Sequence, residues 1–71
     1  MYVAIWYDEQ DLSRAWGADS EKGYAELSAD LEAADYREGR PDVLLVVRRT
    51  YELVEPSSAT YMLIDERKAG E

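Results

Sequence analysis

The sequence predicts a small α+β domain, with one main helix packed on a face of a three-stranded, mainly antiparallel sheet. Segments 2–7, 43–54 and 59–64 are rich in β-branched, aliphatic and aromatic residues, which favour strands. Residues 20–38 carry apolar side chains at helical spacing. The 71 residues are about the length of one small domain, so we expect a single domain over 1–71. The predicted order is strand, helix, strand, strand.

The first predicted strand, 2–7, ends at the acidic run 8–11. Three apolar residues follow at the spacing i, i+3 and i+4, which is that of one or two helical turns. These residues are Leu12, Ala15 and Trp16. Gly17 comes next, and glycine often ends a helix. The pattern predicts a short extra helix near residues 9–17.

The main helix is predicted at 20–38. Asp19 or Ser20 can cap its start, and Gly39 followed by Pro41 is a stop signal. Four residues follow the spacing i, i+3, i+7 and i+10 of a buried stripe. They are Tyr24, Leu27, Leu31 and Ala34. We expect this stripe to pack on the sheet.

A turn at 55–58 joins the strands 43–54 and 59–64, and the polar tail 66–71 is expected to fray. We expect the first strand to pair beside 59–64 in an all-antiparallel sheet. The alternative is a parallel pairing with 43–54 through a right-handed crossover. The face away from the helix keeps Leu44, Val46 and Trp6, so a dimer, a partner or the short helix should cover it.

Composition excludes several kinds of active site. The chain has no Cys and no His, which excludes a disulfide scaffold, a Cys/His zinc site, thiol catalysis and a His-based triad. The acidic run 8–11 does not begin an EF-hand loop, because Leu12 and Arg14 stand where ligands are required. No glycine-rich phosphate-binding motif occurs. We therefore expect no catalytic residue, no cofactor and no metal.

No segment approaches the roughly eighteen apolar residues that a membrane span requires. The apolar start of the chain lacks the basic region of a signal peptide. We therefore expect a protein of the cytoplasm. The net charge of −8 also argues against direct binding to nucleic acid or to an anionic membrane, since both attract an excess of Lys and Arg.

The negative charge is concentrated in residues 8–35, which hold nine acids and two bases. On the predicted helix Glu26 and Asp30 form a row at i, i+4, while other acids line the opposite edge of the apolar stripe. Like charges at this spacing cost a few tenths of a kcal/mol each. Such a placement is explained by docking on a basic protein surface, or by solubility alone. The candidate partner-binding residues are Asp8, Glu9, Asp11, Glu21, Glu26, Asp30, Glu32, Asp35 and Tyr36.

Arg48 and Arg49 are adjacent in the strand 43–54, and we interpret them as an ion-pairing or edge-strand pair rather than a phosphate site.

The acidic run 8–11 and the acidic helix between Glu21 and Asp35, in a tiny Cys-free chain, resemble the small phage-encoded anti-CRISPR proteins. The likeness is closest to inhibitors of type I surveillance complexes, including those that imitate DNA. It implies an inhibitor, not an enzyme, whose acids meet Lys and Arg of a Cas subunit and block target-DNA recognition. It also implies action in the host bacterial cytoplasm.

The alternative reading is a non-enzymatic interaction or regulatory module that binds through its sheet, because the predicted face with Leu44 and Val46 is apolar and the hairpin edges are open. In either case we expect a monomer or a weak homodimer.

Overall fold

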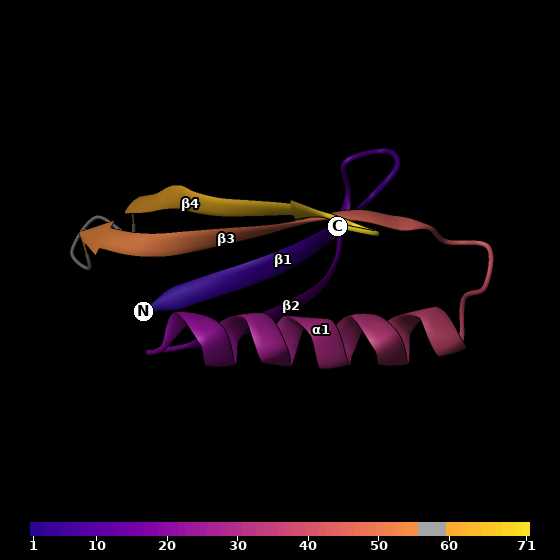
Figure 1. Ribbon diagram of the computed structural model, residues 1–71, viewed down its shortest axis with the longest axis horizontal. Helices are drawn as coiled ribbons and strands as arrows, with labels where there is room; N and C mark the ends of the chain where they lie inside the picture. The colour runs from indigo at the N-terminus through magenta and orange to yellow at the C-terminus, as the bar shows by residue number, and fades with distance from the viewer. Residues whose placement is uncertain (56–59) are drawn as a thin grey trace.

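The computed structural model describes residues 1–55 and 60–71, which form four strands and one helix (Figure 1). In chain order these are β1 (Tyr2–Asp8), β2 (Ser13–Asp19), α1 (Lys22–Glu38), β3 (Leu45–Glu55) and β4 (Thr60–Lys68). The strands form one sheet in the order β2-β1-β3-β4, and every neighbouring pair is antiparallel. The predicted α+β class, with a helix on one face of an antiparallel sheet, is confirmed. The sheet has four strands rather than three.

The helix predicted near residues 9–17 is wrong, because this segment forms the turn and second strand of a β-hairpin. The Asp8 carboxylate accepts the backbone N–H groups of Gln10 and Leu12 at 2.8 and 3.0 Å, which stabilises the turn. Asp11 has a φ of 63°, a left-handed conformation that aspartate tolerates better than most residues. The side chains after the turn then alternate, with Ala15 buried and Trp16 exposed. The spacing that fits a helical turn therefore also fits a short strand.

The missed strand also changes the order of the sheet. β1 pairs with β3, and neither the predicted neighbour 59–64 nor a parallel pairing with 43–54 occurs. Because β2 reverses the chain before α1, the chain leaves the helix at the end of the sheet where β1 finishes. β3 therefore enters antiparallel to β1 and directly beside it.

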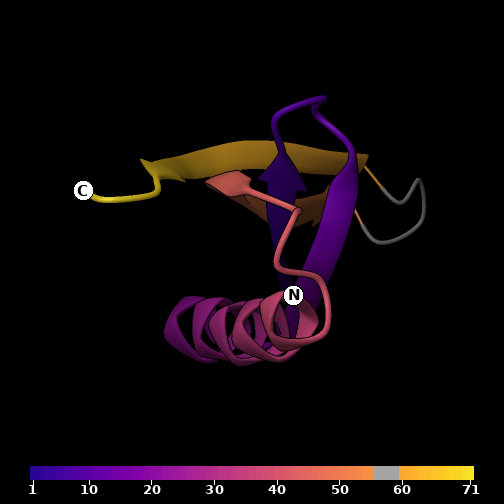
Figure 2. The ribbon, with the colours of Figure 1, turned by 90° about the vertical axis from the view of Figure 1, so that its right-hand side faces the viewer.

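The helix lies on one face of the sheet and packs mainly on β2 and β1, with β4 at the far edge (Figures 1 and 2). It approaches β2 closely at Gly17. A Cβ atom added there would lie 2.4 Å from the Cβ of Ser28 and 2.5 Å from the backbone nitrogen of Ala29. Gly17 therefore does not end a helix. It provides the space in which α1 lies against β2.

This close contact decides which side of α1 is buried. The buried residues are Ala25, Ala29 and Ala33, at the spacing i, i+4 and i+8. The stripe predicted to be buried is wrong, because Tyr24 is 58% exposed, Leu31 is 64% exposed and Leu27 is exposed as well. Leucine and tyrosine side chains are too long for a helix that rests on glycine and alanine. Ala33 completes a small core with Ala15 and Leu45, against which Trp6 and Val43 pack.

The last strand is longer than predicted, since residues 65–68 of β4 pair with β3, and residues 66–68 of the tail expected to fray are part of the sheet. Most of the turn predicted at 55–58 lies outside the described residues, as does Ala59. Trp6 faces α1 rather than the opposite face, because its Nε1 donates to a helix carboxylate. Leu44 precedes β3 and is exposed. In the described part of the chain no helix is long and apolar enough to span a membrane.

Candidate functional site

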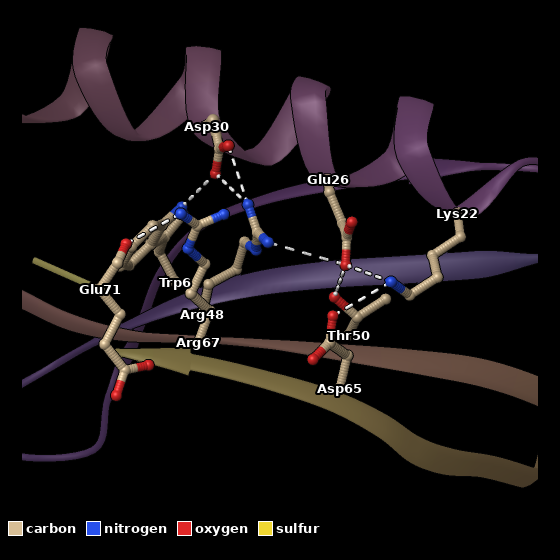
Figure 3. A network of polar contacts seen from close by, with 9 residues as sticks. All are labelled: Trp6, Lys22, Glu26, Asp30, Arg48, Thr50, Asp65, Arg67 and Glu71. Carbon is tan, nitrogen blue, oxygen red and sulfur yellow. Dashed lines mark hydrogen bonds and ion pairs between the residues drawn. The ribbon is translucent and has the colours of Figure 1, made fainter. Parts of the chain in front are cut away.

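Two of the acids proposed to bind a partner lie in a polar network between α1 and the sheet (Figure 3). Arg48, on β3, is almost fully buried and donates its Nη1 to both carboxylate oxygens of Asp30, at 3.0 and 2.8 Å. Trp6 donates its indole Nε1 to Asp30 Oδ1 at 2.8 Å. The Nη2 atom of Arg48 also lies 3.7 Å from the carboxylate of Glu26. The row of Glu26 and Asp30 is therefore directed toward a cation of the protein itself.

The same network continues toward β4. The Thr50 hydroxyl donates to Glu26 at 2.6 Å, and Lys22 Nζ lies 3.4 Å from the same carboxylate. Lys22 also donates to Asp65 at 3.1 Å, and this hydrogen bond raises the pKa of Lys22 and lowers the pKa of Asp65. Because Lys22 is on α1 and Asp65 is on β4, the network joins the helix to the far edge of the sheet.

A second cluster holds Asp8 and Tyr36. Arg14 donates its Nε to Asp8 at 2.6 Å and its Nη1 to the Tyr36 hydroxyl at 2.9 Å. The backbone N–H of Leu12, followed by the Arg14 guanidinium, holds the pKa of Asp8 below its ordinary value despite its burial. The guanidinium of Arg40 stacks over the Tyr36 ring, with its Cζ 4.3 Å from the ring centre. Asp8 and Tyr36 therefore hold the hairpin turn against the end of α1.

Asp11 lies on the other face of the sheet. Arg49 donates to Asp11 at 2.8 Å and to Glu66 at 2.9 Å, and its guanidinium lies over the Tyr7 ring. The prediction that Arg48 and Arg49 form ion pairs is confirmed, with one arginine on each face of β3.

The remaining four predicted acids are exposed and form no ion pair with any residue of 1–55 or 60–71. They are Glu9, Glu21, Glu32 and Asp35. Glu21 occupies the N-cap position of α1, but its side chain makes no capping hydrogen bond. Glu32 and Asp35 border the same hollow beside Tyr36. These four carboxylates are the part of the predicted site that remains free to meet a partner.

Sequence reasoning missed the apolar part of this surface, because it assigned Tyr24, Leu27 and Leu31 to the core. In the structure these residues lie on the side of α1 opposite the buried alanines, and Asp35 follows Leu31 one turn later on the same side. We call this surface, comprising Tyr24, Leu27, Leu31 and Asp35, the outer helix face. Glu32 lies beside it on the flank of α1 toward β2, where it borders the same hollow as Arg14 and Ala15. The alanines at i, i+4 and i+8 were the signal that could have identified the buried side.

The face of the sheet away from α1 carries an open depression of about 390 Å³. It is lined by Val3, Ile5, Tyr7, Tyr51 and Tyr61. The hydroxyls of Tyr7 and Tyr51 lie 3.0 Å apart. Burial, followed by this hydrogen bond, raises the pKa of Tyr7 to about 12. The tyrosine is therefore a neutral hydrogen-bonding group at physiological pH.

Among the described residues there is no group of three or more acidic side chains arranged to hold a metal ion. No protein-family model matches the chain, and neither the curated proteins nor the solved structures that were searched gave a match. The evidence on function therefore comes from the outer helix face and from the face of the sheet away from α1.

Proposed function

We propose that the protein is a non-catalytic, acidic inhibitor that docks its outer helix face on a basic, nucleic-acid-reading surface of another protein. The observation that carries the proposal is that α1 exposes its largest apolar side chains next to carboxylates that form no ion pair in the described residues, with Asp35 on the same side and Glu32 on the adjoining flank toward β2. A helix selected only to cover a sheet would bury Tyr24, Leu27 and Leu31 and expose its alanines. The observed arrangement is the reverse.

The two kinds of side chain have different roles in such an interface. Burying a leucine side chain against a partner contributes about 1.5–3 kcal/mol, so Leu27 and Leu31 supply affinity. Exposed carboxylates contribute mainly to the association rate and to the choice of a positively charged partner. The partner that fits is a protein surface with an apolar hollow bordered by Lys and Arg.

The DNA-mimicking charge is carried by only some of the acids predicted from the sequence. Glu26 and Asp30 face Arg48, Thr50, Trp6 and Lys22, so they contribute to the fold. The carboxylates that can replace phosphates are Glu32 and Asp35, with Glu9 and Glu21 as further contributors. The resemblance to inhibitors of type I CRISPR complexes makes a Cas subunit that reads target DNA the first partner to test.

The test is binding to purified type I Cas subunits at several salt concentrations, with duplex DNA as competitor. We expect the Glu32→Lys/Asp35→Lys double variant to bind at least about tenfold more weakly, and wild-type binding to weaken steeply as salt rises. A control with the same charge change, Asp42→Lys/Glu71→Lys, alters exposed acids outside the outer helix face and should bind almost as wild type.

Binding that is indifferent to salt, to duplex DNA and to the Glu32/Asp35 reversal would refute DNA mimicry by α1. Circular dichroism of both double variants confirms that the comparison is made between folded proteins.

A further inference from the structure

The open face of the sheet, opposite α1, carries large apolar side chains on all four strands. Residues that are paired across neighbouring strands share a face of the sheet. On the open face Trp16 of β2 is paired with Ile5 of β1. Further along, Val3 of β1 is paired with Tyr51 of β3, and Tyr51 is paired with Leu63 of β4. Leu53 and Tyr61 form the next pair along β3 and β4. Within residues 1–55 and 60–71 there is no second helix or sheet that packs on this face.

The exposure of these side chains is high for an apolar surface. Trp16 is 62% exposed, Leu63 is 49% exposed and Tyr61 is 44% exposed. An antiparallel sheet with one face in water normally carries polar residues on that face. Here the alternation is apolar on the open face, and the polar network of Arg48, Glu26 and Asp30 lies on the covered one. The open face therefore has the composition of a buried layer.

The charge of this face favours a second copy of the chain as its binding partner. Apart from Glu55 at the far end of β3, its charged residues are Arg49 and Lys68, which offset Asp11 and Glu66. The face thus carries almost no net charge on a chain whose net charge is −8. Two copies of such a chain repel each other across their acidic surfaces, including the outer helix face. The nearly neutral apolar face is where two copies can approach without this repulsion.

The size of the face also suits a second copy. The spacing between strands and the rise per residue give a flat area of roughly 550 Å² for four strands of these lengths. The accessible surface of the face is larger than this flat area, because side chains protrude from it. Specific interfaces begin at about 600 Å² of accessible surface per partner.

We propose that two copies of the chain associate through their open sheet faces and form a two-layer β-sandwich with α1 on each outer side. Aligned packing places the two sheets about 10 Å apart, so that the inward side chains of Trp16, Tyr61 and Leu63 interdigitate with their counterparts. The dimer leaves both outer helix faces free, because each helix lies on the opposite side of its own sheet (Figure 2). It does not depend on the proposed docking of α1.

Analytical ultracentrifugation over a wide concentration range tests the proposal. We expect a wild-type dimer whose stability is unaffected by high salt, since its interface is apolar. Leu63→Lys should raise the dimer dissociation constant at least about a hundredfold. The matched control Leu31→Lys makes the same change at an exposed leucine of the outer helix face and should remain dimeric.

A second variant separates face packing from edge pairing. Trp16→Ser alters the open face on β2, at the sheet edge opposite β4, and should also weaken the dimer. A dimer that persists in Trp16→Ser but is lost in Leu63→Lys would mean pairing through the β4 edge and would overturn the proposal. A wild-type monomer at every concentration would overturn it as well. If Leu63→Lys fails to fold, Trp16→Ser alone decides between these outcomes.

Discussion

The two faces of the sheet differ in a way that is unusual for so small a protein. The face under α1 contains a glycine, short alanines and a network of charged side chains, whereas the open face contains tryptophan, tyrosine and leucine. The two sides of α1 differ in the same way, since its alanines are buried whereas Tyr24, Leu27 and Leu31 are exposed. The covered layer is held by close approach and ion pairs, and most of the large apolar surface remains available for binding. This difference indicates that the fold is built to present surfaces rather than to enclose a core.

The largest effect on the covered layer is expected from Gly17→Ala. The added Cβ would meet backbone atoms of α1 at 2.5 and 2.8 Å, so the helix itself must move away from β2. We expect a loss of about 3 kcal/mol in the free energy of unfolding, measured by urea denaturation. Gly23→Ala is the matched control, because nothing lies within 4 Å of its added Cβ. That substitution should stabilise the protein by up to about 1 kcal/mol. Equal effects at the two glycines would contradict the close contact.

A smaller loss of stability is expected when Arg48, the cation at the centre of the network between α1 and the sheet, is replaced. Arg48→Met keeps an unbranched side chain but leaves Asp30 and Glu26 without the guanidinium between them. Because the Asp30 side chain is 45% exposed, water compensates in part, and we expect a loss of about 2 kcal/mol in unfolding free energy. Arg37→Met, at an exposed position of α1, should change stability by less than about 0.5 kcal/mol. An unchanged Arg48→Met protein would show that the network does not stabilise the covered face.

The smallest effect concerns the pH dependence of the hairpin turn. Folding lowers the pKa of Asp8, so its ionised form stabilises the native state above the ordinary aspartate pKa of about 3.9. This stabilisation is lost as the pH falls through the lower pKa of the folded state. Asp8→Asn should therefore be less stable than wild type at neutral pH, and the difference in melting temperature should shrink as the solution is acidified below about pH 4. A difference that stays constant with pH would show that the Asp8 charge is not involved.

Sequence patterns were sufficient to predict those parts of the fold that depend on strong signals between residues close together in the chain. The class, the first strand, the main helix and the final hairpin follow from β-branched runs, from helical spacing and from the stop residues after the helix. The predicted cap was wrong, because Asp19 and Ser20 precede the N-cap residue, which is Glu21. The site was predicted only in part. Glu9, Glu21, Glu32 and Asp35 form no ion pair with the residues that the structure describes, whereas Asp8, Asp11, Glu26, Asp30 and Tyr36 contact other residues of the protein. Charge and spacing along a helix do not reveal whether an arginine on another strand lies opposite.

The sequence by itself determined the α+β class, the position of α1 and the concentration of acids in residues 8–35, because these depend on residue type and on neighbours within a few positions. Only the tertiary structure decided that 13–19 is a strand and that the alanines of α1 face inward. The physical reason is the contact between Gly17 and Ala29, which are distant in sequence. Once the two backbones lie this close, only alanine-sized side chains fit between them, and the larger apolar residues turn to the surface.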